Sequence, residues 1–185
     1  MGFYVNTFAV ISIVLSSAAV GHAENHFILE LTGGLASDAA VDNEVDSGTA
    51  ASATFGVGGR IPGQSPAYYF IARVGRAEFG YKAGHPYAYT TVNRQQRDWA
   101  LGGRAYLPIT SRLRVVAQIA VGETIDDASI TRSGNNPLAL ASSTFSIFTQ
   151  AGIQFRVTDK FALGLAADIA IYPAHEHSNL AARAD

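Results

Sequence analysis

The sequence predicts an all-β protein: an antiparallel, up-and-down transmembrane β-barrel with seven strands readable of an expected eight. Three observations favour this fold. Apolar and polar residues alternate with a period of two along seven segments. The connections between these segments are alternately long and short, and charged side chains gather on the face opposite the apolar one. Charged residues make up only 15% of the chain, against about 25% in a typical soluble domain.

The N-terminus has the pattern of a signal peptide. An apolar run from Phe8 to Leu15 is followed by small residues and by Gly21-His22-Ala23, a small-x-small cleavage site. We therefore expect export and cleavage after Ala23, although Met1 to Thr7 lacks the usual Lys or Arg. A short membrane anchor or a buried helix is the alternative. This divides the chain into a signal peptide (1–23), a barrel domain (24–173) and a polar C-terminal segment (174–185).

Each expected strand has one face of alternating Phe, Leu, Ile, Val or Ala residues. The seven strands cover residues 26–35, 51–61, 67–82, 97–107, 112–123, 143–157 and 160–172. In the first, Phe27 and Leu29 oppose Glu30, and in the last, Leu163 and Leu165 oppose Asp168. The third strand is the least regular, because Ile71 shares a face with polar residues. Most of these strands are near the ~10 residues that a tilted strand needs to cross a bilayer.

The connections separate into two kinds. Residues 61–67, 108–111 and 157–160 are short and rich in turn formers, whereas 37–49, 83–96 and 124–142 are long and polar. Their strict alternation predicts a sheet with short turns at one rim and long loops at the other. Transmembrane barrels place short turns on the periplasmic side and long loops outside.

The polar face predicts a filled interior. It carries arginines and carboxylates among small residues, while lysine is nearly absent from the strands. These residues are expected to form a lumen charge network: Glu30, Arg60, Arg73, Asp98, Arg104, Arg114, Arg156 and Asp168. Since unpaired buried charge is costly, they should pair inside the barrel. An eight-stranded barrel is just wide enough for side chains to fill.

Aromatic residues near strand ends predict girdles at the two membrane interfaces. The candidates are Tyr68, Phe79, Tyr81, Trp99, Tyr106 and Tyr172. In hydrocarbon every strand edge must be paired, and bacterial barrels have an even number of strands, eight at minimum. We therefore read residues 174–185 as the start of a fourth outer loop and expect the closing strand to be missing after it.

In these features the segment from Glu24 to Tyr172 resembles the small eight-stranded outer-membrane barrels of the OmpA/OmpX type. The resemblance rests on the alternating strands, the loop parity and the hairpins "YLPITSRLRV" and "FRVTDKFALGL". It implies an outer-membrane location, a role in envelope integrity or adhesion, outer-membrane lipid and the barrel-assembly machinery as partners, and no enzyme activity. The C-terminal strand ending in Phe or Trp that is typical of the family is missing.

The expected function is thus a structural or surface-interaction role, with an extracellular ligand reached through the long loops. Two alternatives remain: a soluble periplasmic barrel that binds an apolar ligand with its apolar faces inward, and a lipid-modifying barrel enzyme. No cofactor is expected. Absence of cysteine excludes disulfides and thiolate metal sites. A net charge of −2 without a basic block gives no reason to expect nucleic acid binding.

Three motifs resemble chemical sites without meeting their requirements. His175, His177 and Ser178 suggest a catalytic or metal cluster, but each histidine would face away from Ser178 on a strand, and two imidazoles make a weak metal site. The acidic stretch 42–48 lacks the spacing of a calcium loop. The glycine-rich stretch 56–60 precedes no helix and so does not form a phosphate loop. No catalytic, cofactor or metal residue is therefore predicted.

Overall fold

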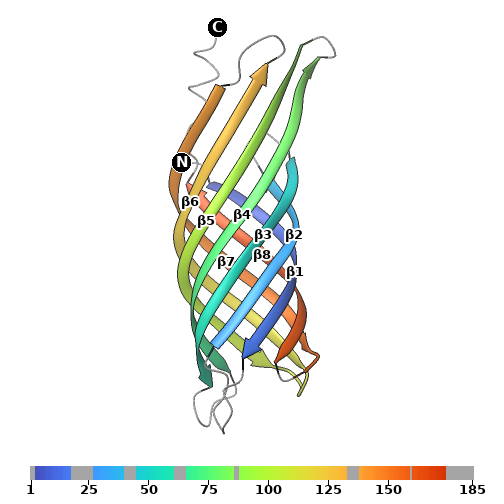
Figure 1. The fold of residues 1–185 in the computed structure, drawn as a ribbon, viewed down its shortest axis with the longest axis vertical. Coiled ribbons are helices and arrows are strands. Elements are labelled where there is room, and N and C mark those ends of the chain that lie inside the picture. Colours follow the sequence, from blue (N-terminus) through green and yellow to red (C-terminus); the bar gives the residue numbers. More distant parts are fainter. Residues whose placement is uncertain are drawn as a thin grey trace.

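In the computed structural model the chain forms a closed, up-and-down antiparallel barrel, as predicted (Figure 1). The structure describes residues 3–17, 27–39, 45–60, 66–85, 88–132, 138–158 and 160–173. The strands found there are β1 (Phe3–Ser17), β2 (Phe27–Ala39), β3 (Val45–Arg60), β4 (Ala67–His85), β5 (Ala88–Pro108), β6 (Leu113–Arg132), β7 (Leu138–Arg156) and β8 (Phe161–Pro173). None of the described residues belongs to a helix that is long and apolar enough to cross a membrane.

The closing strand is the segment that was interpreted as a signal peptide. The seven expected strands correspond to β2–β8, and β1 pairs with both β2 and β8. The expectation that the closing strand would lie beyond the end of β8 is therefore wrong for this barrel. The physical reason is that a signal-peptide core and a membrane-crossing strand are both apolar runs of similar length. Cleavage after Ala23 is untested by the structure and stays a prediction.

The two rims differ as expected, but the long connections are largely strand. β4 and β5 stay paired as far as His85 and Ala88, and β6 pairs with β7 as far as Ile130 and Leu138. Segments 83–96 and 124–142 were expected to be loops, and this detail is wrong. Their Tyr, Thr, Val and Ile residues suit a paired strand, so the hairpins extend instead of ending in long coils.

At the other rim the turns are tight. The carbonyl of Leu113 accepts hydrogen bonds from the amides of Ile109 (2.8 Å) and Thr110 (3.1 Å), and the Thr110 hydroxyl accepts from the amide of Leu113. The carbonyl of Phe161 likewise accepts from the amide of Val157 at 2.9 Å. These turns satisfy the backbone where the strands reverse.

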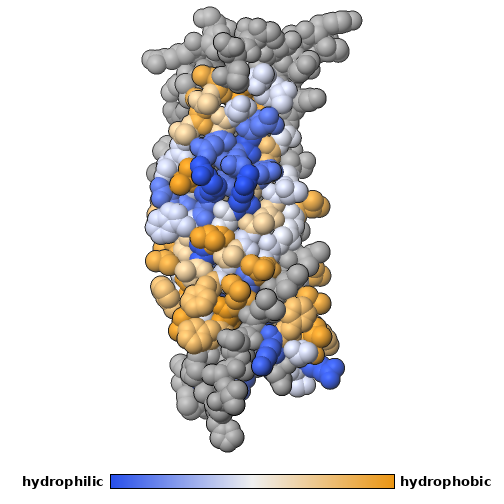
Figure 2. Space-filling model, viewed as in Figure 1, coloured by the Kyte–Doolittle hydropathy of each residue, from blue (hydrophilic) through white to orange (hydrophobic). Residues whose placement is uncertain are grey.

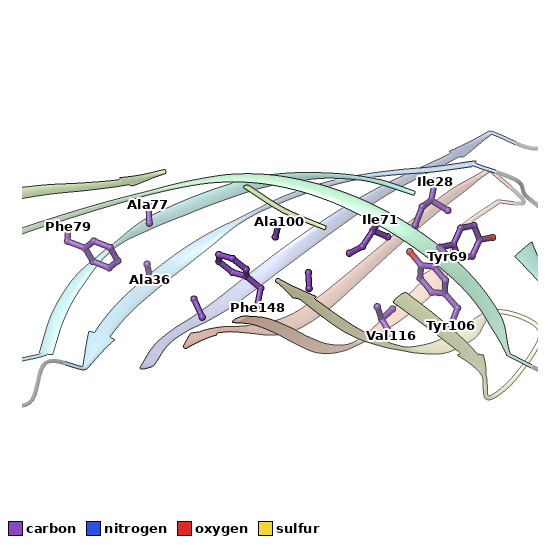
Figure 3. Close-up of a cluster of buried hydrophobic side chains, with 12 residues drawn as sticks. Ile28, Ala36, Tyr69, Ile71, Ala77, Phe79, Ala100, Tyr106, Val116 and Phe148 are labelled. Carbon is purple, nitrogen blue, oxygen red and sulfur yellow. The ribbon is translucent and has the colours of Figure 1, made fainter. Parts of the chain in front are cut away.

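The large apolar side chains of the alternating faces point outward. Leu35, Phe70, Ile119 and Leu165 are each at least 60% exposed, whereas Glu30 on the opposite face is fully buried. The alternative of a soluble barrel with its apolar faces inward is therefore wrong. The interior also holds an apolar cluster along its length (Figure 3), formed by residues such as Ile28, Tyr69, Ile71, Val116 and Phe148.

Candidate functional site

The interior is filled by a polar network centred on Arg104. Its guanidinium forms an ion pair with Glu30, and both side chains are fully buried. Arg104 Nε donates to Gln118 Oε1 (2.9 Å), and its Nη2 donates to Gln150 Oε1 (2.7 Å). The strand register explains the arrangement. Arg104 on β5 is directly opposite Gln118 on β6, which is opposite Gln150 on β7, which in turn is opposite Asp168 on β8. Inward polar residues on four adjacent strands therefore form one continuous layer.

A second layer lies next to the first, toward the tight turns. Gln154 donates from Nε2 to Glu30 Oε2 (3.0 Å) and accepts on Oε1 from Arg114 Nε (3.0 Å). The Arg114 guanidinium lies 4.0 Å from the centre of the Tyr106 ring. Tyr106 in turn packs edge-on against Tyr69, with ring centres 5.5 Å apart. Cation–π contact and hydrogen bonding thus anchor Arg114, which forms no ion pair with a carboxylate among the described residues.

A third group surrounds Arg73 on the other side of the Arg104 layer. Arg73 Nη1 forms an ion pair with Asp168 Oδ2, and Nε lies 3.3 Å from Asp98 Oδ1. The guanidinium also lies 5.1 Å from the centre of the Phe148 ring. Six of the eight predicted network residues therefore meet in the interior, in groups around Arg73, Arg104 and Arg114.

The other two lie at the rim. Arg60, the last residue of β3, is exposed, and Arg156, the last residue of β7, is half-buried. Their alternation places them on the inward side, but the strands end there and solvent reaches them. Both belong to the short-turn rim and not to the packed interior.

Some interior contacts were missed from the sequence. Arg94 Nε donates to Asp126 Oδ2 (2.6 Å) near the long-hairpin rim, in segments that had been interpreted as loops. The Thr124 and Ser146 hydroxyls lie 2.7 Å apart and the Thr32 and Ser52 hydroxyls 2.5 Å apart, as cross-strand pairs. Register was the available signal for Thr32 and Ser52, which are directly opposite on β2 and β3. Thr124 and Ser146 are diagonal neighbours, since Thr124 is opposite Thr144 and Ser146 is opposite Gly122.

The six aromatic residues predicted to form girdles lie in different places. Tyr68 and Trp99 lie on the outer surface, 46% and 47% exposed, and their contact with a membrane interface stays a prediction. The prediction for Phe79 and Tyr106 was wrong, since both belong to the buried interior cluster. The alternation of β4 and β5 turns these two rings inward, which a count of aromatics near strand ends ignores. For Tyr81 and Tyr172 the structure describes the backbone alone.

The outer surface is divided into an apolar belt and a polar wall. The belt on β6 runs from Leu113 to Val121 as alternate outward residues, and the same rows continue on β7 and β8 as Ile147, Ile153 and Leu165. Figure 2 shows hydrophobic side chains over the lower half of the barrel and hydrophilic ones gathered above them. The polar wall, defined here as Arg76, Glu78, Gln95, Arg97 and Asp127, lies on the outer face of β4–β6.

The border between belt and wall is a single register row. Val74, Trp99, Glu123 and Phe145 are successive cross-strand neighbours on β4–β7. The Trp99 indole N–H donates to Glu123 Oε2 at 3.0 Å, so within this row an aromatic ring is hydrogen-bonded to a carboxylate. Above this row the wall residues pair with one another, as in the Arg97–Asp127 and Arg76–Glu78 ion pairs.

Beside the wall, a cavity of about 580 Å³ lies near the outer ends of β4–β7. It is lined by Phe79, Arg94, Ala128 and Leu140 from one side of the sheet, together with neighbouring residues such as Asn93 and Ser129. Its surface mixes amide, charged and apolar groups and shows no single ligand chemistry.

The other candidates give no site. Residues 175–178 lie outside the described part of the chain, as do residues 42–44 of the acidic stretch 42–48, whose remainder belongs to β3. Within the described residues no group of three or more His, Asp or Glu side chains could hold a metal ion. Gly56 to Arg60 lie within β3, where a Cβ on Gly58 would meet the Tyr68 carbonyl oxygen at 2.1 Å. That glycine permits close strand packing.

Comparison with known proteins assigns the chain to no family. No protein-family model matches the sequence, and no curated protein matches it. Among solved structures, the chain is similar to Ail, the attachment invasion locus protein of Yersinia pestis, with a TM-score of 0.39, 10% identity, and coverage of 92% of this chain and 96% of Ail. Ail in complex with the heparin analogue sucrose octasulfate gives a TM-score of 0.38 at the same identity and coverage. The translocator domain of the autotransporter NalP from Neisseria meningitidis gives 0.37 at 9% identity, covering 92% and 88%.

Proposed function

We propose that the protein is an outer-membrane β-barrel that anchors the extended β4–β7 hairpins at the cell surface. The observation that carries this proposal is the apolar belt. On β6 it extends over about ten residues, the length with which a tilted strand covers an apolar band of ~25 Å. Exposed apolar surface of this extent on a soluble monomer would be an aggregation hazard, whereas in a bilayer it meets lipid.

The proposed role is structural or interactive, through envelope integrity or adhesion. Strands β4–β7 contain 19, 21, 20 and 19 residues against 13 in β2 and β8, so these four continue well past the belt. Their outer ends carry the polar wall and would face an extracellular ligand. Outer-membrane lipid would contact the belt, and the barrel-assembly machinery would insert the chain.

A wide pore is not part of the proposal. Arg73, Arg104 and Arg114 with their partners cross the interior from several strands, which favours a filled lumen over a water-filled channel. We also propose no enzymatic activity. Alanine at His177 and Ser178 should therefore leave membrane lipid composition unchanged, and a changed lipid A would contradict this.

Export requires a signal, and the predicted signal overlaps β1. A chain cut after Ala23 loses the strand that pairs with both β2 and β8. One mature chain cannot both lack residues 1–23 and use them to close its barrel. N-terminal analysis of the membrane-extracted protein decides which of the two occurs.

The location can be tested with single cysteines, because the natural chain has none. Ala139→Cys lies at the exposed outer end of β7, and Ser111→Cys lies in an exposed turn at the opposite rim. A membrane-impermeant maleimide should label Ala139→Cys in intact cells and Ser111→Cys only after lysis. Recovery of the protein in the soluble periplasm without detergent, or equal labelling of both positions, would contradict the proposal.

A further inference from the structure

Two adjacent turns at the short-turn rim carry exposed cations. The turn between β5 and β6 ends at Arg112, and the turn between β7 and β8 ends at Lys160; both residues are exposed. Arg156, the last residue of β7, is half-buried. The amide of Arg156 donates a hydrogen bond to the carbonyl of Arg112 at 2.7 Å, so the two turns lie side by side. Arg112, Arg156 and Lys160 are called the cationic turn cluster below.

The described residues do not neutralise the charge of this cluster. None of its three side chains forms an ion pair with a carboxylate in the part of the chain that the structure describes. In the sequence, the stretches 107–114 and 155–162 contain four cations and a single acid, Asp159, which lies outside the described residues. The fourth cation, Arg114, is held in the interior by Gln154. This part of the rim therefore has a net positive charge.

The arginines of the polar wall, toward the opposite rim, are arranged differently. Arg97 forms an ion pair with Asp127, and Arg76 forms one with Glu78. These two arginines thus have carboxylate partners within the chain, whereas the cationic turn cluster has none among the described residues. The cluster can therefore take a negatively charged partner from outside the chain.

Exposed apolar side chains flank the cluster. Ile109 in the first turn is 58% exposed, and Val157 in the second is 49% exposed. Each of them precedes the cation of its turn, Arg112 or Lys160, by three residues. At the lower end of the barrel in Figure 2, hydrophilic side chains lie beside hydrophobic ones. The partner should therefore combine a negative charge with an apolar part.

We propose that the cationic turn cluster binds the phosphate groups of anionic phospholipids in the membrane leaflet at the short-turn rim. Guanidinium and ammonium groups donate charge-assisted hydrogen bonds to phosphate oxygens. Arg and Lys side chains reach the headgroup level while their stems lie along apolar surface. The exposed Ile109 and Val157 favour a lipid over the polar polymer of the cell wall, because they can contact the acyl chains of the lipid whose phosphate is bound.

This inference rests on the proposed membrane location, since the cluster meets a leaflet only if the belt lies in the bilayer. Each Lys or Arg near an anionic membrane surface contributes roughly fivefold to lipid binding. Added salt should weaken the binding, because exposed charges are screened within about 10 Å at 0.1 M ionic strength.

The test measures how much phosphatidylglycerol and phosphatidylcholine the full-length protein retains from neutral detergent, by native mass spectrometry. The wild type should prefer phosphatidylglycerol. Arg112→Gln should reduce this preference about fivefold, and the double variant Arg112→Gln, Lys160→Gln about twentyfold, following the estimate for each cation. Arg132→Gln is the matched control, because Arg132 is an exposed cation at the other end of β6, and it should keep the preference. Arg112→Lys keeps the charge and should also keep it. The heat-modifiable gel shift shows that each variant is folded.

Three results would overturn the inference. The first is equal retention of the two lipids by the wild type, and the second is a loss in Arg132→Gln as large as that in Arg112→Gln. The third is binding of soluble peptidoglycan fragments that Arg112→Gln abolishes, without any lipid preference, which would assign the cluster to the cell wall. If maleimide labelling of Ala139→Cys and Ser111→Cys gives the result expected above, each of these outcomes removes this inference alone. Recovery of the protein in the soluble periplasm would remove the proposed function as well.

Discussion

Arg104 and Glu30 are 74 residues apart in the sequence and form an ion pair inside the barrel with both side chains fully buried. The pair connects β5 with β2 across the interior, between strands that are not neighbours in the sheet. Gln118, Gln150 and Gln154 hydrogen-bond to one or other of the two ions. The charges are thus held by a network that satisfies several of their hydrogen bonds, the condition under which buried ions are tolerated.

Removing one ion should destabilise the barrel more than removing both. Arg104→Met leaves Glu30 buried without a cation, a change that costs about 3–5 kcal/mol. The double variant Glu30→Gln, Arg104→Met removes the lone charge and should recover a large part of that loss. Urea unfolding in detergent, followed by the heat-modifiable gel shift, measures both. Equal losses for the single and double variants would show that the network amides, and not the ion pair, set the stability.

Two adjacent glycines of β5 should respond in opposite ways to the same substitution. A Cβ on Gly102 would lie 2.1 Å from the Ile119 carbonyl oxygen and 2.4 Å from Ala120 Cα, whereas a Cβ on Gly103 meets nothing within 4 Å. Gly102→Ala should therefore lose about 1–3 kcal/mol through overpacking. Gly103→Ala is the matched control and should be neutral or slightly stabilising, as urea midpoints of the two variants will show.

The barrel class and strands β2–β8 could be predicted because the alternation of apolar and polar residues with a period of two is visible in a single sequence. The sequence also predicted that Glu30, Arg73, Asp98, Arg104, Arg114 and Asp168 face one interior. The pairing of each carboxylate with its arginine depends on how far strands that are not neighbours are shifted along one another. No local sequence pattern determines this shift. Phe79 and Tyr106 lie near strand ends, as girdle residues do, but strand alternation turns both rings inward. Segment 3–17 was not expected to be a strand because apolarity on both faces hides the alternation.

The membrane depth of the belt predicts a difference between two alanines. Ala117 on β6 lies mid-belt and Ala141 on β7 lies beyond its border, and both are exposed on the outer face. Ala117→Arg should destabilise the inserted barrel by about 2–4 kcal/mol, and Ala141→Arg by about 0–1 kcal/mol. Unfolding in lipid vesicles measures the difference. If both variants behaved alike in vesicles, the belt would not be the lipid-contacting surface.

If β1 closes the barrel, cysteines placed opposite one another on β1 and β8 should form a disulfide. A chain that has lost β1 by cleavage cannot form it. In the folded chain Ile13 is directly opposite Leu163 on β8 and Leu31 on β2. The double variant Ile13→Cys, Leu163→Cys should therefore form a disulfide, and Ser12→Cys, Leu163→Cys, one residue out of register, should form little. The strand matters because its loss would leave the edges of β2 and β8 unpaired in hydrocarbon, at several kcal/mol for each backbone group. Mass spectrometry of the heat-modifiable form, before and after reduction, detects both the link and the N-terminus. A folded barrel whose chain begins at Glu24 would contradict closure by β1 and would mean that another strand pairs with β2 and β8.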